Sequence, residues 1–124
     1  MFRIGTDIVE VKRIEKSAQR ESFLRRVYSQ AESALFSDKV NGYESMAGNW
    51  AAKEAFAKSL GTGVEDFGLS EVEVLRDKLG APYIRLSGNA KRIADEMGLD
   101  FSVSISHTSE LAIATVIAFP KEDK

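Results

Sequence analysis

The most informative stretch of the 124-residue sequence is Phe101-Ser-Val-Ser-Ile-Ser-His-Thr-Ser-Glu-Leu-Ala-Ile-Ala-Thr-Val-Ile-Ala-Phe119. From Phe101 to Ser106, apolar residues alternate with serines, which predicts a strand with one buried face. Leu111 to Phe119 is apolar along its length, which predicts a central strand. The polar residues between them are few enough for a turn, so the two strands are expected to form a hairpin.

A second hairpin is predicted before this one, because apolar and polar residues also alternate on both sides of a turn at residues 77–82. Four late strands in two tight hairpins argue against a doubly wound parallel sheet, which needs long crossovers. The expected fold class is therefore α+β: a mainly antiparallel sheet with one long buried helix and several shorter helices.

The other predicted elements give the order strand, three helices, hairpin, helix, hairpin. They are a strand from Phe2 to Val9, a helical segment through Ile14–Ala18, a helix from a Ser29–Glu32 capping box to Phe36, a long helix from Tyr43 to Leu60 ended by Gly61, and a helix capped by Ser87 and ended by Gly98. We expect one domain over residues 1–119 and a charged tail at 120–124.

Composition excludes several kinds of site. The chain has no cysteine and one histidine, so disulfides, thiolate metal sites and paired imidazoles are ruled out. The net charge of −2 gives no reason to expect nucleic-acid binding, and no apolar run is long enough to span a membrane. Met1–Ile8 lacks the pattern of a signal peptide, and we expect a cytoplasmic protein.

Two carboxylates stand in unexpected places. Glu54 continues an apolar stripe of the long helix, and Asp7 interrupts a short apolar strand. Either could be structural: Glu54 could pair with Lys58 one turn later, and Asp7 could lie at a strand edge. Isolated carboxylates without paired histidines also suit Mg²⁺, which takes one or two of them and completes its shell with water and phosphate.

The basic residues are concentrated near the start of the chain. Lys12, Lys16 and Arg20 follow one another at intervals of four, with Arg13 beside them, and would share one face of a helix. This face is either solvated surface or a docking site for an acidic protein.

Four blocks occur in a characteristic order: Gly5-Thr-Asp-Ile-Val-Glu-Val-Lys-Arg-Ile14, Trp50-Ala-Ala-Lys-Glu-Ala-Phe-Ala-Lys58, Gly61-Thr-Gly63 and Ser104-Ile-Ser-His107. With them, the chain closely resembles, from Ile4 to Ile117, the holo-(acyl-carrier-protein) synthases, the small bacterial type of 4′-phosphopantetheinyl transferase. The resemblance implies transfer of phosphopantetheine from coenzyme A to a serine of apo-acyl carrier protein, in support of fatty acid biosynthesis, with release of adenosine 3′,5′-bisphosphate.

The resemblance also implies roles for individual residues. Asp7 and Glu54 would hold Mg²⁺, Glu54 and Lys58 would be catalytic, and Glu54 or a metal-bound water would be the base. Coenzyme A would meet Lys53, Gly61, Thr62, Pro82, His107 and Thr108. The carrier protein would meet Lys12, Arg13, Lys16 and Arg20.

Members of this family are typically homotrimers with active sites at the subunit boundaries, which we also expect here. The chain departs from the family pattern at Asn49, where many members carry arginine, and at Ala81, where lysine or arginine is common. Both changes remove a cation and leave the strength of coenzyme A binding open. Two alternatives also remain: another Mg²⁺-dependent enzyme acting on a nucleotide diphosphate, or a non-catalytic domain that binds a carrier protein.

Overall fold

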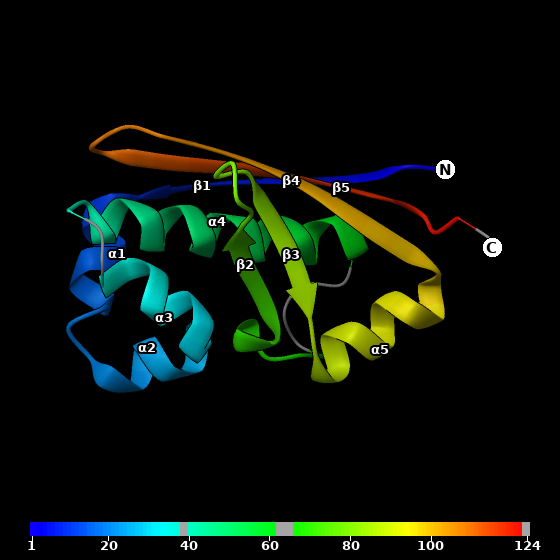
Figure 1. The fold of residues 1–124 in the computed structure, drawn as a ribbon, viewed down its shortest axis with the longest axis horizontal. Coiled ribbons are helices and arrows are strands. Elements are labelled where there is room, and N and C mark those ends of the chain that lie inside the picture. Colours follow the sequence, from blue (N-terminus) through cyan, green and yellow to red (C-terminus); the bar gives the residue numbers. More distant parts are fainter. Residues whose placement is uncertain (38–39, 62–65, 123–124) are drawn as a thin grey trace.

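Strand β5 (Leu111–Pro120) lies at the centre of a three-stranded antiparallel sheet, between β1 (Arg3–Glu10) and β4 (Leu99–His107) (Figure 1). The computed structural model describes residues 1–37, 40–61 and 66–122. The hairpin predicted for β4 and β5 is confirmed, as is the central position of β5. A strand that is apolar on both sides avoids the sheet edge, where one row of its backbone groups would stay unpaired.

The long helix α4 (Gly42–Leu60) covers one face of this sheet. Both surfaces of the contact are rich in small residues, so the helix can lie close to the strands. The alanines with an exposure of 1% or less are Ala47, Ala51, Ala52, Ala55 and Ala57 on α4 and Ala112, Ala114 and Ala118 on β5. As predicted, α4 ends at Gly61, whose φ of 78° is a left-handed conformation that glycine adopts without a Cβ clash.

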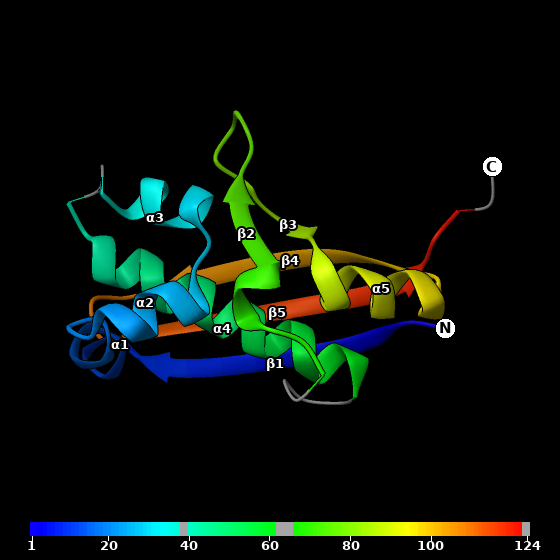
Figure 2. The same cartoon turned by 90° about the horizontal axis from the view of Figure 1, so that it is seen from below.

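Three short helices pack at one end of the sheet (Figure 2): α1 (Val11–Ser17), α2 (Glu21–Val27) and α3 (Gln30–Ser37). The capping box before α3 is confirmed by reciprocal bonds of 3.1 and 3.2 Å between Ser29 and Glu32. The sequence prediction missed α2, so the described part of the chain before the first hairpin has four α-helices rather than three. Its signal was the four-residue spacing of Phe23 and Val27, both of which are buried.

The first hairpin forms a separate two-stranded sheet, with β2 (Val72–Arg76) paired to β3 (Pro82–Leu86). A 3₁₀ turn, η1 (Leu69–Glu71), precedes it, and α5 (Gly88–Met97) follows it. Ser87 stands at the N-cap of α5 as predicted, but its side chain makes no capping bond, and the Ala90 N–H donates to Glu71 Oε1 at 2.9 Å instead. The α+β fold class is confirmed, with its strands divided between two antiparallel sheets.

Within the described parts of the chain, no helix combines the length and the apolar character that crossing a membrane requires.

Candidate active site

Gly5 is the point of closest approach between β1 and α4. A Cβ at this position would lie 2.1 Å from the Ala55 carbonyl oxygen and 2.6 Å from the Ser59 amide nitrogen. Only a residue without a side chain permits this approach. Side chains two apart on a strand share a face, so the contact at Gly5 also directs Asp7 toward α4.

Lys58 reaches Asp7 across this crossing. Its ammonium group lies 3.2 Å from Asp7 Oδ1 and 3.0 Å from the Thr6 carbonyl oxygen. The Asp7 side chain is 18% exposed and that of Lys58 is 55% exposed, so the ion pair lies at the protein surface, with Asp7 the more buried partner. The alternative of a Glu54–Lys58 pair on one helix face is wrong among the described residues, because Lys58 binds β1 instead.

Glu54 lies near the same carboxylate and is partly buried. Burial raises its pKa most, the negative charge of Asp7 raises it further, and Lys58 and Arg13 act in the opposite direction. Two partly buried carboxylates repel each other when both are ionised, and a bound cation would offset that repulsion.

The donor set fits Mg²⁺, which needs few protein ligands when phosphate oxygens and water complete its octahedral shell. It does not fit a metal held by protein alone, since no cluster of three or more acidic, histidine or cysteine residues occurs in the described ranges. Asp7 and Glu54 are the residues that could hold the ion.

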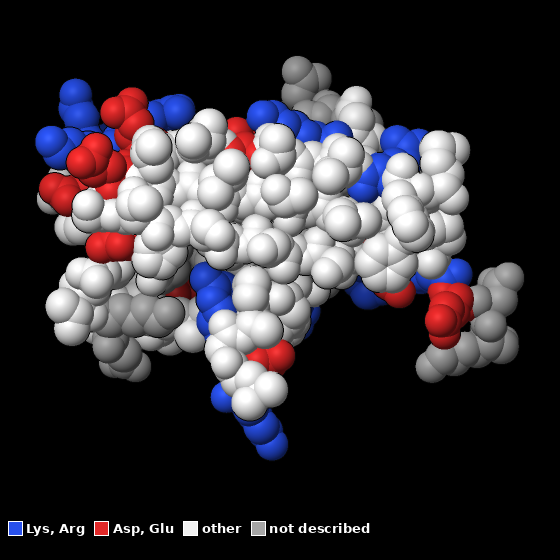
Figure 3. Space-filling model, turned by 90° about the horizontal axis from the view of Figure 1, so that it is seen from above, with Lys and Arg blue, Asp and Glu red and all other residues white. Residues whose placement is uncertain are grey.

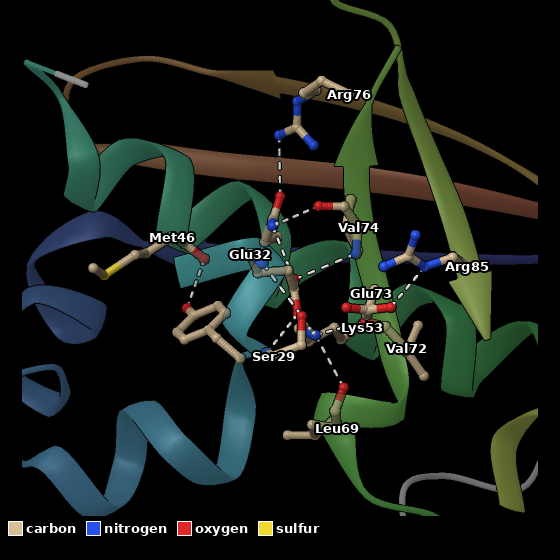
Figure 4. Close-up of polar contacts among 12 residues, drawn as sticks. Ser29, Glu32, Met46, Lys53, Leu69, Val72, Glu73, Val74, Arg76 and Arg85 are labelled. Carbon is tan, nitrogen blue, oxygen red and sulfur yellow. Dashed lines mark hydrogen bonds and ion pairs between the residues drawn. The ribbon is translucent and has the colours of Figure 1, made fainter. Parts of the chain in front are cut away.

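Lys53 is not available to a ligand, contrary to its predicted role in coenzyme A binding. Its side chain is completely buried and makes an ion pair of 2.7 Å with Glu32, which is equally buried (Figure 4). Its ammonium group also donates to the carbonyl oxygens of Leu69 and Val72. Burial lowers the pKa of Lys53, while Glu32 opposes that shift. The pair joins α3, α4 and β2.

His107 and Pro82 line a second site, a pocket of about 210 Å³ between α4, β4 and the β2–β3 hairpin. The His107 Nδ1 atom lies 3.0 Å from Glu44 Oε1 in the first turn of α4. Arg76 also lines this pocket and played no part in the sequence prediction. In the sequence, Arg76 is only part of a predicted hairpin, so its place in this pocket could be found only from the tertiary structure.

Two other residues that were predicted to bind coenzyme A lie near these sites, but their polar groups already make hydrogen bonds within the protein. The Thr108 hydroxyl accepts the amides of Glu110 and Leu111 and so stabilises the β4–β5 turn. The Gly61 N–H donates to the Lys58 carbonyl at 3.0 Å and is not free to bind an anion. Thr62 lies outside the described residues.

The basic residues predicted on one helix face are divided by the end of α1 at Ser17. Lys12, Arg13 and Lys16 are exposed on α1, whereas Arg20 lies beyond it, at the start of α2. The Arg13 guanidinium is held over the Trp50 ring, 5.9 Å from its centroid. Trp50 belongs to α4, so this contact places Arg13 beside the helix that carries Glu54.

The two sites lie at opposite edges of the sheet. Asp7 is on β1 and His107 is at the end of β4, with β5 between these strands (Figure 2). Strands are spaced by about 4.8 Å, so the edges are roughly 10 Å apart. Since α4 contacts both β1 and β4, the helix also separates the two groups of residues.

Comparison with known proteins places this arrangement in one family. A family model described as the 4′-phosphopantetheinyl transferase superfamily matches residues 3–116. The holo-(acyl-carrier-protein) synthase of Alkaliphilus oremlandii is 43% identical over 117 residues, covering 93% of this chain and 96% of that protein. The enzyme of the same name from Halothermothrix orenii is 45% identical, covering 92% and 94%.

Solved structures agree. A holo-(acyl-carrier-protein) synthase from Neisseria meningitidis superposes with a TM-score of 0.87 at 30% identity, covering 94% of this chain and 97% of that one. The Helicobacter pylori enzyme, in complex with coenzyme A, gives a TM-score of 0.81 at 36% identity, covering 94% and 99%. The chain therefore belongs to the 4′-phosphopantetheinyl transferase superfamily and is an enzyme of its holo-(acyl-carrier-protein) synthase family.

Proposed function

We propose that the chain transfers the 4′-phosphopantetheine group of coenzyme A to a serine of apo-acyl carrier protein in a Mg²⁺-dependent reaction that supports fatty acid biosynthesis. The observation that carries this proposal is the meeting of Asp7, Glu54 and Lys58 where β1 crosses α4. These residues place two carboxylates and an ammonium group within reach of one pyrophosphate.

In the proposed reaction, the serine oxygen bonds to the phosphorus that carries pantetheine, and the bond from that phosphorus to the bridging oxygen breaks. Adenosine 3′,5′-bisphosphate leaves, and the serine proton is lost to a base. When bound, Mg²⁺ would neutralise charge on the phosphoanhydride. Asp7 and Glu54 would hold the ion, and Lys58 would place a further positive charge on the phosphate oxygens.

Mass spectrometry of apo-acyl carrier protein, incubated with the enzyme, coenzyme A and Mg²⁺, tests the proposed function. A mass gain equal to one phosphopantetheine is expected, with none after chelation and recovery when Mg²⁺ is added back. An unchanged carrier protein would contradict the proposal, and transfer that survives chelation would contradict its metal requirement.

We also propose that the enzyme is a homotrimer with active sites between subunits. The sheet face opposite α4 is uncovered and largely free of charge, as Figure 3 shows. Exposed isoleucines stand on this face, with Ile4 67% and Ile8 59% accessible on β1. Isolated apolar residues on a surface are ordinary, but a contiguous patch of this kind is typical of an interface. The separation of the two sites within one chain is explained if a neighbouring subunit supplies the nucleotide pocket.

Light scattering is expected to give three times the chain mass of 13.7 kDa. Replacing Ile113, which is 43% exposed on β5, by aspartate should break the assembly and lower activity, because it places a charge in an apolar contact. The matched variant Asn89→Asp adds the same charge to an exposed position of α5, away from this sheet face, and tests whether charge alone is responsible. A fully active monomer would contradict the trimer.

The exposed bases of α1 are proposed to bind the acidic surface of the carrier protein. Arg13→Glu should raise KM for apo-acyl carrier protein and change coenzyme A binding little, because Arg13 is exposed on α1 and does not line the nucleotide pocket. For an exposed arginine we expect a loss of about 1 kcal/mol in kcat/KM, roughly fivefold, that shrinks as salt is raised. Arg92→Glu on α5 makes the same charge change elsewhere and should have little effect. Equal kinetics for Arg13→Glu and wild type at low salt would exclude docking on α1.

A further inference from the structure

Arg76 is a partly buried cation without a carboxylate partner among the described residues. No acidic oxygen in those ranges lies within the 4.0 Å limit of an ion pair with its guanidinium. Burial lowers the pKa of Arg76, and the more distant Glu32 opposes that shift. A guanidinium that has lost water without gaining an ion pair is prepared for an anionic ligand.

The position of Arg76 is set from inside the protein by Asn49. The Asn49 side chain is completely buried, and its amide group donates to Glu32 Oε2 at 2.9 Å and to the Val74 carbonyl at 3.0 Å. These two bonds fix which end of the amide faces Arg76. The remaining oxygen accepts Arg76 Nη2 at 3.0 Å, and Figure 4 shows Arg76 at the outer end of this network.

Arg76 lines the pocket that contains His107 and Pro82. One carboxylate, Glu44, lies in the same pocket, but its Oε1 atom is already in contact with His107 Nδ1. The guanidinium has donors beyond the one that Asn49 holds, since arginine carries five N–H groups. The pocket thus combines a positioned arginine with a histidine whose second ring nitrogen is not used by Glu44.

We propose that Arg76 binds the ribose 3′-phosphate of coenzyme A and that Asn49 positions it to do so; this inference rests on the proposed function. Coenzyme A carries phosphate in two places, the pyrophosphate and the ribose 3′-phosphate. The pyrophosphate is the reacting group and belongs with Asp7, Glu54 and Lys58. The pocket of Arg76 and His107, at the opposite edge of the sheet, is therefore assigned to the ribose 3′-phosphate.

This assignment also gives a physical account of the asparagine at position 49. The amide of this residue, on the buried face of α4, orients a cation from β2. Coenzyme A affinity is then expected to depend on Arg76, a residue outside all four sequence blocks.

Calorimetric binding of coenzyme A and of 3′-dephospho-coenzyme A to the intact enzyme tests the proposal. Wild type should prefer coenzyme A by tenfold or more, and Arg76→Gln should reduce that preference to about threefold or less by weakening coenzyme A alone, since a charge-assisted contact is lost. Arg76→Lys should retain part of the preference, because lysine keeps the positive charge but lacks the planar set of N–H donors of the guanidinium group. Asn49→Ala should reduce the preference less than Arg76→Gln. In turnover, Arg76→Gln should raise KM for coenzyme A more than it lowers kcat.

Lys78→Gln is the matched control, because it removes the same charge from the exposed turn of the same hairpin without touching the pocket. It should leave the preference intact. A wild-type preference that survives in Arg76→Gln, or a wild type that binds both ligands equally, would overturn the role of Arg76 while phosphopantetheine transfer still stands. Failure of the wild type to modify the carrier protein would instead overturn the proposed function, whatever the two ligands show.

Discussion

Replacing Glu54 by glutamine is expected to lower kcat/KM for carrier-protein modification by roughly 10²- to 10³-fold at limiting Mg²⁺, the order found when one electrostatic group of an active site is removed. Glutamine keeps the size of the side chain but not its charge, and the charge is what would hold the ion beside Asp7. Raising the Mg²⁺ concentration should recover part of the rate. The measurement is initial-rate mass spectrometry over a range of Mg²⁺ concentrations.

The stability of this variant separates a catalytic role from a structural one. Burial and the charge of Asp7 raise the pKa of Glu54, so the ionised side chain destabilises the metal-free fold near neutral pH. Glutamine should therefore leave the free energy of unfolding unchanged or increase it. Glu10→Gln, at the exposed end of β1, is the control for loss of one negative charge. Wild-type rates for Glu54→Gln at limiting Mg²⁺ would show that Glu54 is not a ligand.

Replacing Lys53 by methionine should cost about 3–5 kcal/mol of folding free energy, the range for removing one member of a buried ion pair. The substitution leaves Glu32 charged and buried, with Ser29, Asn49 and Val74 as its remaining donors among the described residues. It also leaves the carbonyl oxygens of Leu69 and Val72 without the ammonium group. Urea unfolding followed by circular dichroism measures the loss.

Two further variants make this result specific. Lys91→Met removes an exposed lysine of an i,i+4 pair on α5 and should change stability by less than about 0.5 kcal/mol. The double change Glu32→Leu with Lys53→Met removes both charges and should recover much of the stability lost in the single variant. A small loss in Lys53→Met would mean that the buried pair contributes little to holding α3, α4 and β2 together.

Features set by local chemistry could be predicted from the sequence. The alternation over Phe101–Ser106 and the apolar run over Leu111–Phe119 identified a half-buried strand and a central strand. The capping box at Ser29 and the glycine at position 61 also formed as expected, because these motifs depend on a few consecutive residues. Asp7 and Glu54 stood out because each places a carboxylate among apolar neighbours, whereas the role of Lys58 followed from the family resemblance.

Contacts between distant residues could not be predicted in this way. Lys53 and Lys58 are five residues apart on the same helix, yet one is fully buried against Glu32 and the other reaches Asp7. Five residues correspond to about 140° around a helix, so the two side chains point to different neighbours. Which lysine meets which neighbour depends on how α4 is rotated against β1 and β2, and that rotation is fixed by packing at Gly5 and among the alanines.

The sequence by itself therefore determined most of the helices and strands, the central position of β5 and the charged residues that are candidates for a chemical role. Only the tertiary structure brought Asp7 to Lys58, removed Lys53 from the site and added Arg76 to the pocket of His107. The reason is physical: backbone periodicity and capping act over a few residues, whereas burial and charge pairing act through space between segments that the chain separates by dozens of residues.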